Sequence, residues 1–121
     1  MKSAYVLEKK NNFLFVTLTG EYDRHEFMSY GKTLMDHCKK EEVFKVLVNA
    51  LGVTGTNLSV MERFVIGESV AALFPPTVKL AVAWPEEFMT RFAETVAVNR
   101  GSFLAVFTNV EEAEQWLVAP S

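Results

Sequence analysis

Two short, mostly apolar runs, each interrupted by one lysine, constrain the fold of this chain most. They cover residues 43–48 and 78–83, are rich in valine, and alternate along the chain with segments of helical periodicity. A strand with one face in water alternates apolar and polar side chains, whereas a strand covered on both faces is apolar throughout. The two runs therefore predict inner strands of a parallel sheet with helices on its faces. A length of 121 residues suits one such domain, residues 1–121.

Helix starts are marked by residues that cap a helix or suit its first turn. Each candidate cap is followed three residues later by a glutamate that completes a capping-box-like pair, and acidic residues favour the positive end of the helix dipole. Two prolines at 75–76 end the second helix, which is predicted over residues 59–73. The predicted starting residues of the four helices are Asp23, Ser59, Pro85 and Asn109.

The remaining strands complete an α/β domain. Residues 4–8 and 13–19 are β-rich and flank a short segment with two asparagines, which predicts a hairpin, and residues 103–107 form the last strand. The order ββαβαβαβα predicts a small, mixed, mostly parallel five-stranded sheet with four helices and an antiparallel first strand. We expect one core that contains Leu34, Val46, Val48, Val82, Phe92, Val106 and Trp116.

Five segments of these predicted elements carry a family signal. They are residues 18–20, 46–49, 78–82, 105–107 and 111–117. In this order and spacing they resemble the SpoIIAA-like group of STAS domains, which is related to the anti-sigma-factor antagonists. The resemblance implies the SpoIIAA-like/STAS fold and a bacterial regulatory module without catalytic activity, which binds a protein partner or a small ligand.

One departure from that family concerns phosphorylation. Anti-sigma-factor antagonists have Asp-Ser-Ser-Gly or a close relative after the third strand, and a serine there is phosphorylated. Residues 49–59 of this chain lack that motif, and Asn49 stands where the SpoIIAA-like group often has aspartate. The candidate phosphorylation sites are therefore the hydroxyl residues near the next helix start, Thr56 and Ser59. Added negative charge is favourable there, and we expect Thr56 to be the better switch and Ser59 the better cap.

The segment 49–59 is the predicted binding site. It follows a parallel strand and opens a helix, the position where open α/β sheets bind ligands, and helix-start N–H groups can hold an anion. Glycines there let a partner approach the backbone closely. The structural alternative is a tight connection in which the glycines serve turn geometry. The predicted ligand- or partner-binding residues are Asn49, Gly52, Gly55, Thr56, Asn57, Ser59, Met61 and Phe64.

The second helix is apolar around more than one face. Its apolar residues include Val60, Met61, Phe64, Val65, Val70, Leu73 and Phe74. Such a surface needs a cover. The sequence leaves four covers open: the core itself, a second subunit in a homodimer, a small apolar ligand, or a membrane surface. The alternative function is thus a peripheral membrane protein or a lipid-binding protein that uses this helix and the Phe88–Met89 region.

Several functions are disfavoured by the residues present. His25 and His37 lie twelve positions apart, or ~18 Å along a helix, so they cannot share a metal ion. Cys38 is expected to be a core residue. The acidic pairs at 86–87 and 111–112 suit helix starts better than acid–base catalysis. We therefore expect no enzyme, no metal and no cofactor.

Charge and hydropathy describe the expected surroundings. The net charge of −3 gives no electrostatic reason to expect nucleic acid. No apolar run has the length of a signal peptide or of a transmembrane helix, and a single cysteine fits a reducing compartment. We therefore expect a cytoplasmic protein.

Overall fold

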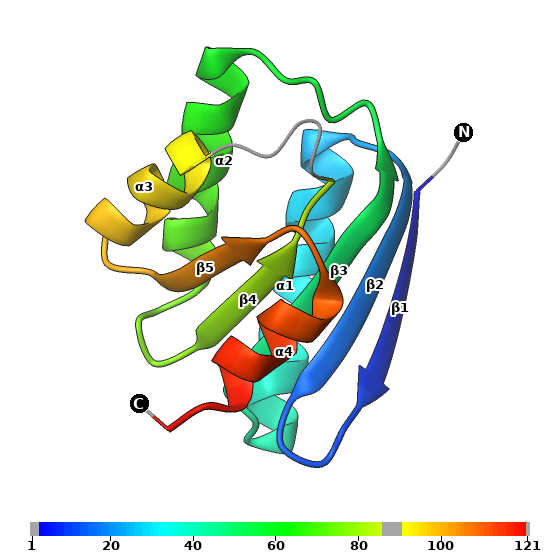
Figure 1. The fold of residues 1–121 in the computed structure, drawn as a ribbon, viewed down its shortest axis with the longest axis vertical. Coiled ribbons are helices and arrows are strands. Elements are labelled where there is room, and N and C mark those ends of the chain that lie inside the picture. The colour runs from blue at the N-terminus through cyan, green and yellow to red at the C-terminus, as the bar shows by residue number, and fades with distance from the viewer. Residues whose placement is uncertain (1–2, 86–90, 121) are drawn as a thin grey trace.

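The computed structural model describes residues 3–85 and 91–120, with the backbone alone for residues 91–93. Strands and helices follow the predicted order (Figure 1). They are β1 (Ala4–Lys9), β2 (Leu14–Glu21), α1 (Arg24–Glu41), β3 (Lys45–Thr54), α2 (Val60–Leu73), β4 (Lys79–Ala83), α3 (Arg91–Asn99), β5 (Phe103–Phe107) and α4 (Val110–Val118).

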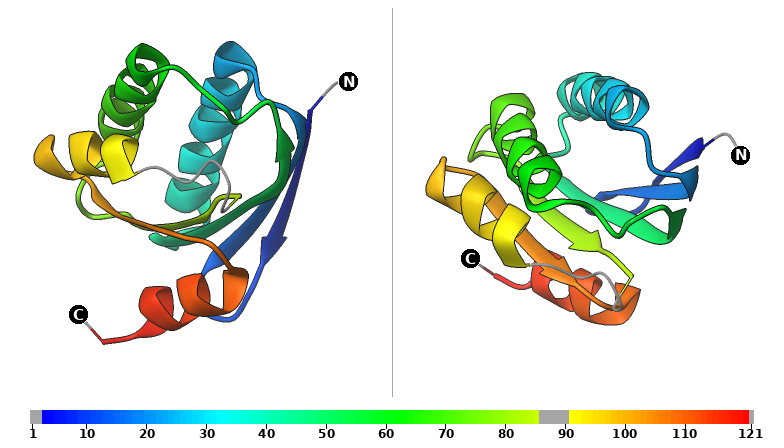
Figure 2. Two further views of the ribbon diagram at one scale, coloured as in Figure 1. Left: turned by 45° about the horizontal axis from the view of Figure 1, so that its top comes forward. Right: turned by 90° about the horizontal axis from the view of Figure 1, so that it is seen from above.

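The strands form one five-stranded sheet in the order β1-β2-β3-β4-β5. β1 is antiparallel to β2, and all later neighbours are parallel. Helices cover both faces: α1, α2 and α3 lie on one side and α4 on the other (Figure 2). This is the α/β architecture that the two apolar runs predict, because the inner strands need apolar side chains on both faces.

The sheet separates the buried side chains into two clusters, so the prediction of one core was wrong. Successive residues of a strand point to opposite faces. Val46 therefore joins Leu34 in the cluster under α1, whereas Leu47 packs against Leu117 of α4. Trp116 is only partly buried beside the second cluster. The side chain of Phe92 lies outside the described residues.

Three of the four predicted helix starts are confirmed by a hydrogen bond to the capping side chain. The backbone N–H of Glu26 donates to Oδ1 of Asp23 at 3.0 Å, and Glu62 donates to Oγ of Ser59 at 3.1 Å. The backbone N–H of Glu112 donates to Oδ1 of Asn109 at 2.8 Å. For α3 the predicted first-turn residues 86–87 and Phe88–Met89 lie outside the described residues.

Lys79 places a charge inside β4 without leaving it unpaired. Its side chain is buried, and its Nζ donates to the carbonyl oxygens of Trp116 at 2.7 Å and Ala119 at 3.3 Å, at the C-terminal end of α4. The ammonium also lies 4.6 Å from the centre of the Trp116 ring. Burial lowers the pKa of Lys79. The ammonium of Lys79 thus caps the C-terminal end of α4 and links this helix to the sheet. A positive charge is favourable there because the C-terminal end of a helix dipole is negative.

Candidate functional site

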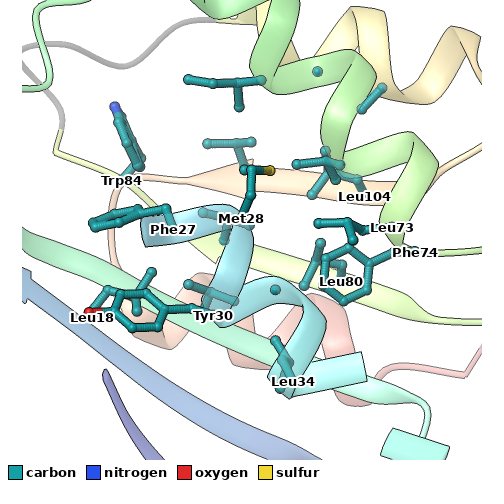
Figure 3. A pocket seen from close by; sticks show the side chains of 18 of the residues that line it. Leu18, Phe27, Met28, Tyr30, Leu34, Leu73, Phe74, Leu80, Trp84 and Leu104 are labelled. Atoms are coloured by element: carbon teal, nitrogen blue, oxygen red, sulfur yellow. The ribbon is translucent and has the colours of Figure 1, made fainter. Parts of the chain in front are cut away.

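A pocket of about 180 Å³ lies between the sheet and the helices α1, α2 and α3 (Figure 3). Its lining is almost entirely apolar. α1 contributes Phe27, Met28 and Leu34, and the end of α2 contributes Leu73 and the following Phe74. Figure 3 shows these side chains together with Leu80, Trp84 and Leu104 around one hollow.

The floor of the pocket consists of two rows of side chains that cross the sheet. Val48, Val82 and Val106 are register partners on β3, β4 and β5, and all three line the pocket. Leu80 and Leu104 form part of the neighbouring row, two residues earlier on their strands. The valine row is only partly buried because it opens onto the pocket, although Val48 and Val82 pack against the core cluster under α1 as predicted.

The wall formed by α2 is unusual for a helix so rich in apolar residues. Gly67 is its only fully buried residue among those described, whereas α1 buries four side chains. The two helices touch where a Cβ atom on Gly31 would lie 2.9 Å from Cδ1 of Leu73. An apolar helix that buries so little of its own surface leaves apolar area for a ligand or partner to cover.

Polar groups occur at a few points of the lining. The hydroxyl of Tyr22 donates to Oε2 of Glu62 at 3.2 Å, and burial together with this carboxylate raises the pKa of Tyr22. Glu62 also pairs with Arg24 at 3.5 Å. Glu94 accepts a hydrogen bond from the backbone N–H of Val106 at 2.6 Å. These contacts fix the side chains of Tyr22 and Glu94 in the lining, and Glu62 supports Tyr22 from outside the lining.

Two polar atoms of the lining residues are buried without a hydrogen-bond partner among the described residues. They are Nε of Arg63 on α2 and the hydroxyl of Tyr5 on β1. A buried polar group that makes no hydrogen bond costs about 1–3 kcal/mol. Both atoms are therefore positions where a bound molecule could restore a lost interaction.

The predicted binding residues do not converge on one site. Thr56 lines the pocket and is only 3% exposed. Phe64 is partly buried, whereas Asn57, Ser59 and Met61 are exposed on the loop and the start of α2. Of the eight predicted residues, only Thr56 belongs to the described lining.

Asn49 and Gly52 lie in β3, which corrects the prediction of a loop from residue 49. β3 runs on to Thr54 through a bulge: Thr17 pairs with Asn49 and Thr19 with Gly52, so one residue of β2 faces two of β3. Oδ1 of Asn49 accepts the N–H of Leu51 at 3.1 Å and so supports the bulge. The loop itself begins at Gly55, whose φ of +69° suits glycine.

The sequence interpretation missed most of the lining, including Phe27, Tyr30, Trp84 and Leu104. Phe27 and Tyr30 lie on α1, Trp84 follows β4 and Leu104 lies on β5, so no local motif joins them. The apolar excess of residues 59–73 was the one signal, because it predicted that α2 needs a cover. That helix does form a wall of the pocket.

Three features of the described residues concern other functions. Residues 3–85 and 91–120 contain no group of three or more histidine, cysteine or acidic side chains that could hold a metal ion. No helix in the same ranges has the length and hydropathy needed to cross a membrane. Cys38 is fully buried in α1, and burial raises the pKa of its thiol to about 11. A thiol in that state is a poor nucleophile.

Comparison with known proteins identifies the fold. No family model matches the sequence, and no curated protein matches it. Among solved structures, an anti-sigma factor antagonist from Mycobacterium paratuberculosis has a TM-score of 0.66 at 11% identity, over 98% of this chain and 96% of that one. An uncharacterized protein with a SpoIIAA-like fold from Shewanella loihica has a TM-score of 0.56 at 15% identity, over 95% and 93% of the two chains. The chain thus has the SpoIIAA-like fold, which confirms the fold that the resemblance to STAS domains implied.

Proposed function

We propose that this domain is a binding module without catalytic activity, and that it holds an apolar small molecule in the pocket between α1, α2 and the sheet. The pocket is the observation that carries the proposal. It lies beside the loop that joins β3 to α2, and Thr56 of that loop is part of its lining. This is also the edge of the sheet where open α/β folds bind ligands.

The size of the pocket matters because an unfilled apolar hollow is costly. Core cavities lower stability by about 24 cal/mol per Å³, so a hollow of 180 Å³ corresponds to at most about 4 kcal/mol. Domains of this size have a total stability of only about 5–15 kcal/mol. A ligand that binds only the folded state stabilises it and so offsets the free-energy cost of the empty pocket. This supports the proposal that the pocket holds a ligand.

The chemistry of the lining supports binding rather than catalysis. The described lining contains tyrosine and threonine hydroxyls, Arg63 and Glu94, but no histidine, cysteine or lysine. Glu94 is engaged by the backbone of β5. A hydroxyl nucleophile needs an adjacent base to be activated, and the described lining offers no such pair.

The direct test is native mass spectrometry of the purified chain combined with titration by the neutral dye Nile red. We expect saturable binding of one dye molecule per chain and a higher melting temperature with bound ligand. A retained small molecule would appear as added mass. The absence of both added mass and saturable dye binding would contradict the proposal. The same spectra report whether the chain is a monomer or the homodimer that the sequence left open.

A second candidate function, a protein-binding switch, is favoured by the start of α2. Val60 is 67% exposed and Met61 is 70% exposed, an apolar pair next to the loop. The fold is shared with an anti-sigma factor antagonist, a regulatory protein by its name. Ser59 is exposed and accessible to a kinase, whereas a phosphate on Thr56 requires the loop to open because Thr56 is buried.

This candidate is tested by the intact mass of the protein from its native cells and by Met61→Glu. We expect a phosphorylated fraction and loss of a specific partner on substitution, with Nile red binding unchanged. Liposome flotation distinguishes a peripheral membrane contact from a protein partner. Wild-type protein that floats, and Met61→Glu protein that does not, would favour the membrane over the protein partner.

A further inference from the structure

We infer that the pocket selects acids: its ligand is a monocarboxylic acid with an apolar tail, and the carboxylate pairs with Arg63 at the start of α2. This inference rests on the proposed function, because it names the ligand class of the same pocket. Arg63 lines the pocket, and its Nε is buried with no hydrogen-bond partner in the described part of the chain.

Arg63 differs in this respect from the other arginines whose side chains are described. Arg24 pairs with Glu62 at 3.5 Å, and Arg100 pairs with Glu68 at 2.8 Å. No ion pair joins Arg63 to any described residue, although Glu62 precedes it in the chain. The carboxylate of Glu62 is directed to Arg24 and to the hydroxyl of Tyr22. The nearest acidic side chain in sequence is therefore occupied elsewhere.

A carboxylate is the group that best satisfies this guanidinium. Arginine stays charged at all physiological pH values, and its planar fork of N–H donors matches the two oxygens of a carboxylate. Arg63 is also in the first turns of α2, where the helix dipole favours negative charge. The described lining contains one acidic side chain, that of Glu94. Its Oε2 accepts the N–H of Val106, so this carboxylate oxygen is directed towards β5.

The pocket also limits the tail. An apolar cavity of about 150 Å³ holds one benzene molecule, so 180 Å³ accommodates roughly seven carbon atoms of a tail. The tail would lie against the valine and leucine rows of the sheet and against Phe74, all of which are apolar. Arg63 is only partly buried as a whole residue, so the acid group sits where the pocket meets solvent and the tail lies inside. Medium-chain fatty acids have this size and polarity.

The experiment compares octanoic acid with 1-octanol by isothermal titration calorimetry of the full chain near neutral pH. The two probes share one tail and differ in the head group. We expect wild type to bind the acid at least about tenfold more tightly than the alcohol, because a hydrogen-bonded charge pair contributes that much. Arg63→Met should reduce acid binding to the level of the alcohol and leave alcohol binding unchanged. Arg100→Met is the matched control, since Arg100 lies outside the described lining and should keep the preference.

Each result has one meaning. Equal binding of acid and alcohol by wild type would overturn the role of Arg63 and leave the apolar pocket standing. Binding of neither probe would overturn the proposed function as well. If Arg63→Met does not fold, as judged by its thermal transition, Arg63→Lys replaces it. Arg63→Lys keeps the charge without the fork, so a preference between those of wild type and the alcohol level is expected, and a preference equal to wild type would contradict a paired guanidinium–carboxylate contact.

Discussion

Tyr5 and Tyr30 stack on one another along the wall of the pocket, but only one of their hydroxyls has a hydrogen-bond partner among the described residues. Their ring centres are 5.1 Å apart with an angle of 23° between the planes. The hydroxyl of Tyr30 shares a hydrogen bond with Ser3 at 2.7 Å, and Ser3 in turn bonds Glu26. The hydroxyl of Tyr5 is buried without a hydrogen-bond partner among the described residues, and burial raises the pKa of Tyr5.

This difference predicts opposite effects for the same substitution. Tyr5→Phe removes an unsatisfied buried hydroxyl, so the free energy of unfolding should rise by about 1 kcal/mol. Tyr30→Phe removes a hydroxyl that makes a hydrogen bond, so it should lower that free energy by about 0.5–1.5 kcal/mol. Urea unfolding followed by circular dichroism measures both variants. Equal destabilisation by the two substitutions would show that the Tyr5 hydroxyl has a partner in solution.

The second prediction concerns the balance between stability and binding in the pocket. Val82→Phe places extra volume in the hollow from the middle of the sheet floor, so the melting temperature should rise by a few degrees while Nile red binding is lost. Val118→Phe makes the same change on α4, at an exposed position on the other face of the sheet, and should alter neither property much. A Val82→Phe variant that binds the dye like wild type would place the dye site elsewhere.

Much of the fold could be predicted because its signals are local. Ser59 and Glu62 are three residues apart, so the pair that begins α2 is visible in the sequence and is present as a hydrogen bond. The extent of β3 was not predictable in this way. Its residues 52–54 pair with residues 19–21 of β2 beyond a bulge, and glycine fits at position 52 because a Cβ atom there would lie 3.0 Å from Cγ2 of Thr19. That contact joins residues far apart in the sequence, so Gly52 was interpreted as a loop residue.

The pocket was harder still to predict, because it depends on how side chains from several elements fail to fill a space. Leu18 and Leu104 lie on strands far apart in the chain, and Gly31 brings α1 close to the end of α2. None of these residues carries a motif. The apolar excess of α2 indicated that this helix needs something to cover it. The arrangement of the other elements decides that α2 lines a pocket instead of being covered by core side chains.

The third prediction separates capping from binding at the start of α2. Ser59→Ala removes the side chain that accepts the N–H of Glu62, so the free energy of unfolding should fall by about 1 kcal/mol. Ligand binding should stay the same, because Ser59 is not among the described lining residues. Asn57→Ala, at an exposed loop position, is the control and should change stability little. A Ser59→Ala variant with normal stability and impaired Nile red binding would reverse these roles.

The last prediction uses the buried thiol of Cys38 and the pH dependence of stability. Burial raises its pKa from 9.0 to about 11, so the folded state keeps the thiol proton at pH values where the unfolded chain has lost it. Below about pH 9 both states hold the proton, and the stabilisation is fully present. Between about pH 9 and 11 the unfolded state ionises first, so the free energy of unfolding falls with rising pH, by about 1–2 kcal/mol from this group.

Cys38→Ala isolates this contribution. The variant should be less stable at neutral pH because it leaves a small cavity, yet its stability should fall less steeply above about pH 9. Tyr5 and Tyr22, whose pKa values are raised, and Lys79, whose pKa is lowered, are present in both proteins, so their contributions largely cancel in the difference. Urea unfolding in the presence of a reducing agent, at several pH values from neutral to alkaline, gives the two curves. Parallel curves would mean that the thiol ionises equally easily in the folded and unfolded chain, and that Cys38 is accessible to solvent.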